Sequence, residues 1–109
     1  MFALRLHPEA DAEAINDAAW IKADDPREGV LFVEALTKAL NRARQNPENY
    51  RKFDGEYRTV KVGKFRYSVI YRFHSEEVQV IAVMHHRKKP GYWRSRARLD
   101  SADWPTQPG

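Results

Sequence analysis

The sequence contains no cysteine and no long apolar run. The missing cysteine excludes a disulfide framework and any metal site built on thiolates, and it fits a reducing compartment. No stretch is apolar over the length that a membrane-spanning helix needs, and the first ten residues lack the apolar segment of a signal peptide. From these absences we expect a cytoplasmic protein that does not use a membrane.

Acidic residues are scarce in the second half of the chain. Residues 1–49 contain 6 Lys/Arg and 9 Asp/Glu, a net charge of −3, whereas residues 50–99 contain 13 and 4, a net charge of +9. Residues 100–109 add −2, which gives the total of +4. A charge distribution divided in this way attracts polyanions or an acidic partner. A basic surface that only contacts water would explain the charge distribution equally well.

Two helices are predicted in the first half. Pro8 suits a first helical turn, and small or apolar residues recur at helical spacing until about residue 23. Asp25 and Pro26 are typical of a second helix start, because the aspartate side chain accepts from free backbone N–H groups and proline fits the first helical position. Pro47 must end that helix by residue 46. The two segments are expected to form an antiparallel helical hairpin.

Strands are predicted at residues 2–6, 56–62, 65–73 and 78–84, where alternation with a period of two is clearest in 65–73. The order β-α-α-β-β-β predicts an α+β fold, with the helical hairpin packed on one face of a small, mostly antiparallel sheet. The other face would be open or covered by a partner, and Arg66 and Arg72 would project from it beside the cations that follow the last strand. We expect one domain at residues 1–99 and a flexible tail at 100–109.

Three segments carry a resemblance to a known family when they are taken in this order. They are HPEA at residues 7–10, FRYSVIYRF at 65–73 and VQVIAVMHHRKKPGYWRSR at 78–96. Together they resemble the RelE/ParE toxin superfamily of type II toxin–antitoxin modules. The resemblance implies a growth inhibitor, of a kind linked to plasmid stabilisation, that a cognate antitoxin neutralises. It also implies that operator DNA is bound only through the antitoxin.

The superfamily divides into two mechanisms. RelE-like members are endoribonucleases that cleave mRNA in the ribosomal A site, whereas ParE-like members block DNA gyrase and need no chemistry of their own. Cleavage by 2′-OH attack needs a base, an acid and cations that stabilise the phosphate. The residues that could supply these groups are His86, Arg87, Lys88 and Tyr92.

Several positions depart from the nuclease pattern. Ser68 stands where RelE-like nucleases carry an arginine, and their second arginine aligns ambiguously with Lys88 or His86. Lys61 and Lys64 match the paired nuclease lysines only loosely. The start and the Pro-x-Tyr-Trp ending look closer to the ParE-like branch, so the leading hypothesis is a toxin that binds its target. The residues proposed to contact the target or another polyanion are Arg58, Lys61, Arg66, Arg72 and Arg94.

Structural roles are the alternative for much of the last segment. His85 could be a half-buried histidine, and Tyr92 with Trp93 could anchor the C-terminal segment. Because adjacent side chains of a strand point to opposite faces, His85 and His86 should not reach the same site. We expect no cofactor. We also expect no metal, since no carboxylate lies at ligand spacing from the histidine pair.

Overall fold

The computed structural model describes residues 1–98 and Trp104. The elements, in chain order, are β1 (Ala3–Leu6), α1 (Pro8–Asp24), α2 (Pro26–Gln45), β2 (Lys52–Asp54), β3 (Tyr57–Lys61), β4 (Tyr67–His74), β5 (Glu77–His85) and the short 3-10 helix η1 (Arg94–Arg98). The predicted α+β fold is confirmed, with one strand more than expected. Strand β2 is only three residues long, too short for an alternating pattern to reveal it. The predicted tail at 100–109 lies outside the described residues except for Trp104.

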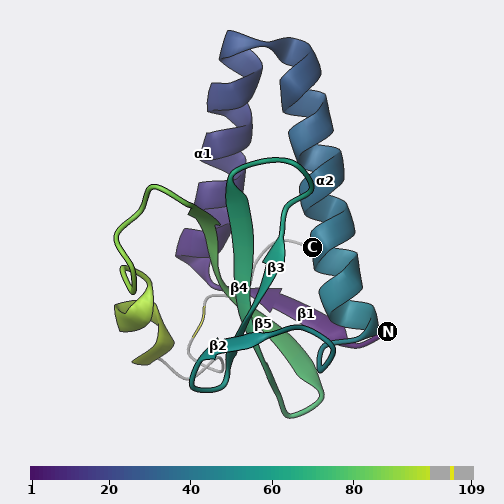
Figure 1. The fold of residues 1–109 in the computed structure, drawn as a ribbon, viewed down its shortest axis with the longest axis vertical. Coiled ribbons are helices and arrows are strands. Elements are labelled where there is room, and N and C mark those ends of the chain that lie inside the picture. The colour runs from purple at the N-terminus through teal and green to yellow at the C-terminus, as the bar shows by residue number, and fades with distance from the viewer. Residues whose placement is uncertain (99–103, 105–109) are drawn as a thin grey trace.

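Each helix begins at a side chain that caps its first turn. His7 Nδ1 accepts from the Glu9 N–H at 3.1 Å, and Asp25 Oδ1 accepts from the Arg27 N–H at 3.0 Å. Asp25 also ends α1, since its own N–H donates to the Ile21 carbonyl at 2.9 Å. One aspartate therefore ends the first helix and starts the second, which produces the tight antiparallel hairpin of Figure 1.

The two helices approach each other closely at Gly29. A Cβ at this position would lie 2.7 Å from the Cβ of Lys22, so a larger residue would separate the helices. The connection between the helices extends beyond the sheet (Figure 1). Within the described residues, no helix is long and apolar enough to cross a bilayer.

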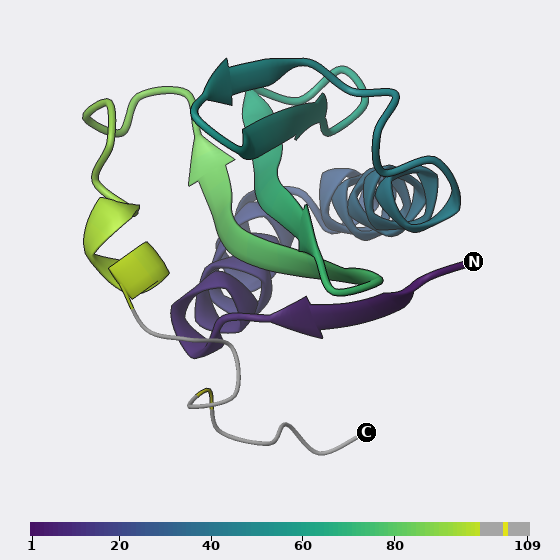
Figure 2. The same cartoon turned by 90° about the horizontal axis from the view of Figure 1, so that it is seen from below.

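The five strands form one mixed sheet in the order β1-β5-β4-β3-β2. β1 runs parallel to β5, and the other neighbouring strands are antiparallel. The helical hairpin covers one face of the sheet (Figure 2). Phe32 of α2 lies at the centre of this core, where its ring meets Phe65 and Tyr67 edge to face at centroid distances of 5.3 and 4.9 Å.

The second face of the sheet is covered by the chain itself. Trp93 is 1% exposed and packs with Ile70, Ile81 and Ala82. The expectation that this face is open or covered by a partner is wrong over this region, because the segment after β5 folds back across it (Figure 2). The expected anchoring role of Trp93 is confirmed by its burial.

Strand β5 contains a bulge that sets the direction of its later side chains. Ile70 pairs with Ala82 while Tyr71 pairs with Val80, so Ile81 is the extra residue. An extra residue shifts the alternation of a strand by one position. Before the bulge the even-numbered residues of β5 belong to the helix-facing core, and beyond it an odd-numbered residue does.

Candidate functional site

Four arginines of the basic half are held by groups elsewhere in the fold, and we call them the tethered cations. Arg58 Nη1 donates to the backbone carbonyls of Glu48 at 3.0 Å and Tyr50 at 2.7 Å. The others are described below, and the complete set is Arg58, Arg72, Arg94 and Arg96.

Arg72 and Arg94 are held by groups on other strands and turns of the sheet. Arg72 Nε donates to Gln79 Oε1 at 2.6 Å, and its Nη1 lies 3.4 Å from a carboxylate oxygen of Glu56. Arg94 Nε donates to Asp54 Oδ2 at 2.9 Å. Arg72 projects from the second face as expected, but its side chain is only 14% exposed. The proposed target contacts Arg58, Arg72 and Arg94 therefore all have internal partners.

A second group of cations lies on two neighbouring loops and is exposed. The loops are residues 62–66 and 86–91, and they are joined by the His86 N–H, which donates to the Arg66 carbonyl at 2.9 Å. We call this group the basic end; it consists of Lys64, Arg66, Arg87, Lys88 and Lys89. None of these five forms an ion pair with any residue of 1–98 or with Trp104.

The sequence around the basic end explains why its charge is not neutralised locally. Neither residues 57–75 nor residues 78–99 contain an acidic side chain. The carboxylates that pair with arginines of these stretches come from α1 and from residues 54–56. Lys61, the remaining proposed contact, donates from Nζ to the Gly63 carbonyl of its own turn at 2.8 Å and is exposed.

The histidine pair is divided between the two faces of the sheet. The His85 ring meets the Tyr67 ring edge to face at 4.8 Å on the helix side, and its Nδ1 accepts from the Arg87 N–H at 2.9 Å. Burial, together with the nearby Arg87 charge, lowers the pKa of His85. His86 Nε2 lies 2.8 Å from Ser68 Oγ on the other side. The expectation that the two histidines face apart is confirmed.

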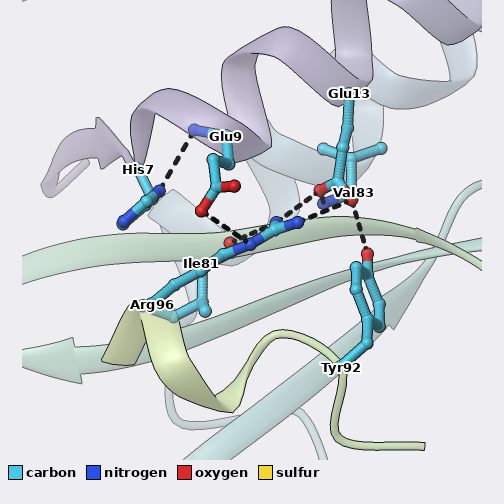
Figure 3. Close-up of polar contacts among 7 residues, drawn as sticks. All are labelled: His7, Glu9, Glu13, Ile81, Val83, Tyr92 and Arg96. Carbon is cyan, nitrogen blue, oxygen red and sulfur yellow. Dashed lines mark hydrogen bonds and ion pairs between the residues drawn. The ribbon is translucent and has the colours of Figure 1, made fainter. Parts of the chain in front are cut away.

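Tyr92 is engaged on α1 rather than beside His86. Its hydroxyl donates to Glu13 Oε2 at 2.6 Å, and burial together with the Glu13 carboxylate raises its pKa well above the usual range (Figure 3). Of the four residues considered for RNA cleavage, Arg87 and Lys88 lie on the exposed loop of the basic end. His86 and Tyr92 have separate hydrogen-bond partners on β4 and α1.

Glu13 and Arg96 form an ion pair that the sequence interpretation did not single out. Arg96 Nη1 donates to Glu13 Oε1 at 2.7 Å, and its Nε lies 3.4 Å from a carboxylate oxygen of Glu9 (Figure 3). The available signal was the spacing of Glu9 and Glu13, four residues apart on one helix face, opposite a segment without acids. That spacing identifies the acids but not which arginine they meet.

Two hollows lie along the outer side of the helical hairpin. One of about 340 Å³ lies between the helices, and one of about 270 Å³ lies between α2 and the turn at 63–65. Glu34 lines both, so the hollows are neighbours on α2. Large apolar side chains are exposed on the same hairpin: Ile15, Trp20, Val30, Leu31 and Val33.

Metal ligands do not gather anywhere in the described part of the chain: residues 1–98 and Trp104 contain no group of three or more His, Asp or Glu side chains placed to hold an ion. A hollow of about 350 Å³ beside β5 brings together Asp17, His85 and Lys88. Burial and the neighbouring Glu13 raise the pKa of Asp17. This hollow lies on the helix side of the sheet, away from the contact of His86 with Ser68.

Comparison with known proteins agrees with the fold and with the order of the segments. A search of curated proteins gives no match. The family model described as ParE toxin of type II toxin-antitoxin system, parDE, matches residues 4–90, which is most of the chain. The match includes both helices, β1 from Leu4 onward, the other four strands and the five cations of the basic end. The chain therefore belongs to the ParE toxin family of type II toxin–antitoxin systems.

Proposed function

We propose that this toxin acts by binding DNA gyrase through the basic end, without cleaving RNA. Membership of the ParE family implies a toxin with an antitoxin partner. Gyrase as the target, the contact surface and the cytoplasm as the place of action are the further steps of this proposal.

The observation that carries the proposal is the separation of the groups that RNA cleavage would need. A base and an acid must both reach the same phosphodiester. The Tyr92 hydroxyl is held by Glu13, with a raised pKa, while His86 is held by Ser68 on β4. Ser68, which stands where a nuclease carries arginine, supplies no cation there. A toxin that only binds needs none of this chemistry.

The basic end supports binding because its five cations are exposed and form no ion pair with any residue of 1–98 or with Trp104. Exposed charges of one sign accelerate association with an anionic partner and select against a cationic one. Arg66 and Arg87 come from different loops that are joined by a backbone hydrogen bond, so their spacing is fixed by the sheet. Such a surface provides affinity without requiring any residue to transfer a proton.

We further propose that the antitoxin binds along the hollows of the helical hairpin. The lining combines apolar side chains with cations and a single acid, so an amphipathic acidic segment is complementary to it. The lining cations are Lys22, Lys38, Arg42 and Lys64, and the acid is Glu34. Because Lys64 also belongs to the basic end, a segment lying in these hollows would reach the edge of the target surface.

The test is the effect of the purified toxin on gyrase-catalysed supercoiling, together with the state of mRNA after the toxin is induced in cells. We expect inhibited supercoiling, a DNA damage response and intact mRNA. Tyr92→Phe should retain most of the inhibition, because the ring, its packing and every cation of the basic end remain. Cleaved mRNA in ribosome-bound complexes with normal supercoiling would show that the chain is an mRNA interferase, and loss of cleavage in Tyr92→Phe would add to that conclusion.

The antitoxin site has its own test. Val33→Asp places a charge in the hollow between the helices, where Val33 is 49% exposed, so folding should be little affected. We expect the variant to remain toxic but to escape neutralisation by the antitoxin of the same operon. Neutralisation at the wild-type antitoxin dose would place the antitoxin elsewhere.

A further inference from the structure

Strand β5 has an edge that no strand within residues 1–98 covers over its second half. β1 pairs with Glu77–Val80 only, since β1 ends at Leu6, whereas β5 continues to His85. The backbone groups that face outward from residues 81–85 therefore need partners from another source. Unpaired edge groups that are buried destabilise a fold, and exposed ones invite pairing with other chains.

Two side chains take the place of the missing strand. The Val83 N–H donates to Glu13 Oε1 at 3.1 Å, and Arg96 Nη1 donates to the Ile81 carbonyl at 3.2 Å. Ile81 and Val83 are 0% and 1% exposed, so these backbone groups are shielded from water. The carboxylate supplies the acceptor and the guanidinium supplies the donor that a neighbouring strand would otherwise supply.

The same carboxylate holds the segment that follows the basic end. Glu13 accepts the Tyr92 hydroxyl at 2.6 Å through Oε2, and it accepts two guanidinium N–H groups of Arg96 at 2.7 and 3.1 Å. The side chains of Glu13 and Arg96 are only 16% and 9% exposed. Figure 3 shows this carboxylate where α1, β5 and the C-terminal segment meet. We call Glu13, Tyr92 and Arg96 the clasp.

The loop of the basic end is attached at both of its ends. At its start, the His86 N–H donates to the Arg66 carbonyl and the His86 ring contacts Ser68. At its end, Tyr92 is fixed by Glu13. Between these two points lie the cations of residues 87–89. A loop fixed at both ends has fewer conformations than one fixed only at its start, so its charges keep their positions.

We propose that Glu13 is a positioning residue for the toxin's target surface, acting through Tyr92 and Arg96 on a loop that it does not touch. The inference rests on the proposed function for its biological meaning, because it assumes that the basic end contacts the target. It also goes beyond the family match, which ends at residue 90, before either C-terminal member of the clasp.

The experiment compares Glu13→Ala and Glu13→Gln with a matched control, Glu9→Ala. Glu9 lies one turn earlier on α1, is 63% exposed and reaches Arg96 at 3.4 Å, but it bonds neither Val83 nor Tyr92 through its side chain. The readouts are hydrogen exchange of the Val83 amide, the rate of tryptic cleavage after Arg87 and Lys88, and growth arrest after induction. Hydrogen exchange reports on the clasp and tryptic cleavage reports on the loop, and neither depends on which target the toxin binds.

We expect the Val83 amide to exchange and the loop to be cleaved about tenfold faster in Glu13→Ala than in the wild type, since both become locally unprotected. The exchange and cleavage rates of Glu13→Gln should lie between those of the wild type and of Glu13→Ala, because an amide oxygen still accepts one hydrogen bond. The control should stay within about twofold. Growth arrest should need more inducer in Glu13→Ala, although every cation of the basic end is still present.

Tyr92→Phe provides a second variant if Glu13→Ala does not fold. It removes only the hydroxyl contact, so loop cleavage should rise by a few-fold with no change at the Val83 amide. Equal exchange and cleavage rates in the Glu13 variants and the control would overturn the proposal. Faster cleavage with unchanged growth arrest would overturn the positioning role as well. A wild-type toxin that leaves gyrase unaffected would refute the proposed target, while exchange and cleavage would still decide on the clasp.

Discussion

The tethered cations and the basic end carry the same charge, but they differ in what lies within reach. Arg72, Arg94 and Arg96 meet carboxylates that come from residues 9–13 and 54–56. The cations of the basic end form no ion pair with any residue of 1–98 or with Trp104, although Lys88 lines a hollow with Asp17, and all five remain exposed. The comparison teaches that the location of the few acids, more than the location of the many bases, divides structural from functional charge in this fold.

The largest expected effect is on a tethered cation. Arg96→Met removes the partner of Glu13, whose side chain is 16% exposed, together with the donor to the Ile81 carbonyl. Removing one member of a buried ion pair costs about 3–5 kcal/mol, so we expect the free energy of unfolding in urea to fall by about that amount. A loss below about 0.5 kcal/mol, the usual range for surface substitutions, would mean that Arg96 is not tethered in solution.

Arg72→Met should have a smaller effect of the same kind. Gln79, which is 2% exposed, loses a charged donor at 2.6 Å, while the exposed carboxylate of Glu56 returns to water at little cost. We expect a loss of about 1–2 kcal/mol in the same urea experiment. Toxicity per folded molecule should be unchanged, and a toxicity defect in a stable Arg72→Met protein would move this residue to the functional group.

The histidines should make stability depend on pH. Burial lowers the pKa of His85 from 6.5, with Arg87, His86 and Arg66 acting in the same direction and Asp17 opposing them. Burial also lowers the pKa of His7, where Arg96 assists and Glu9 and Glu13 oppose. A histidine whose pKa is lower in the folded state than in the unfolded state is neutral in both states at high pH. As the pH falls below the unfolded value, the unfolded chain binds the proton first, so stability is lost.

The free energy of unfolding should therefore fall as the pH drops from about 7 to 5. Asp17 has the opposite sign, because its pKa is raised from 3.8 by burial and Glu13, so its contribution is lost as the pH rises from that value. Comparing the pH profile of the wild type with that of His85→Gln shows the contribution of His85, since Asp17 is retained in both proteins. A pH profile that is equally steep in His85→Gln would exclude His85 as a source of the slope.

Much of the fold follows from the sequence, because the signals for it are local. The caps at Asp25 and Pro26, the break at Pro47 and the alternation in β4 each lie within a few residues of the structure they specify. The bulge at Ile81 was not foreseen, since bulges leave no local pattern in an apolar strand. The short β2 cannot be predicted either, because three residues are too few to show an alternating pattern.

The sorting of the cations could not be predicted because it depends on distant pairs. Glu13 lies 83 residues before Arg96, and Asp54 lies 40 residues before Arg94. The sequence alone places five residues of the basic half in one candidate surface: Arg58, Lys61, Arg66, Arg72 and Arg94. Only the packing of α1 and of residues 54–56 against the rest of the fold shows which of these charges meet a partner.

The most direct test of the account is the double variant Arg66→Ala/Arg87→Ala. The matched control, Arg27→Ala/Arg51→Ala, removes the same charge from exposed positions outside the basic end. We predict that both proteins unfold within about 0.5 kcal/mol of the wild type, because no internal contact of these side chains is lost. The first should inhibit gyrase at least about tenfold less well, as expected when charges of a binding surface are removed, and the control should inhibit normally. Full inhibition by the first variant, or equal loss in both, would contradict the assignment of the basic end as the surface that binds the target.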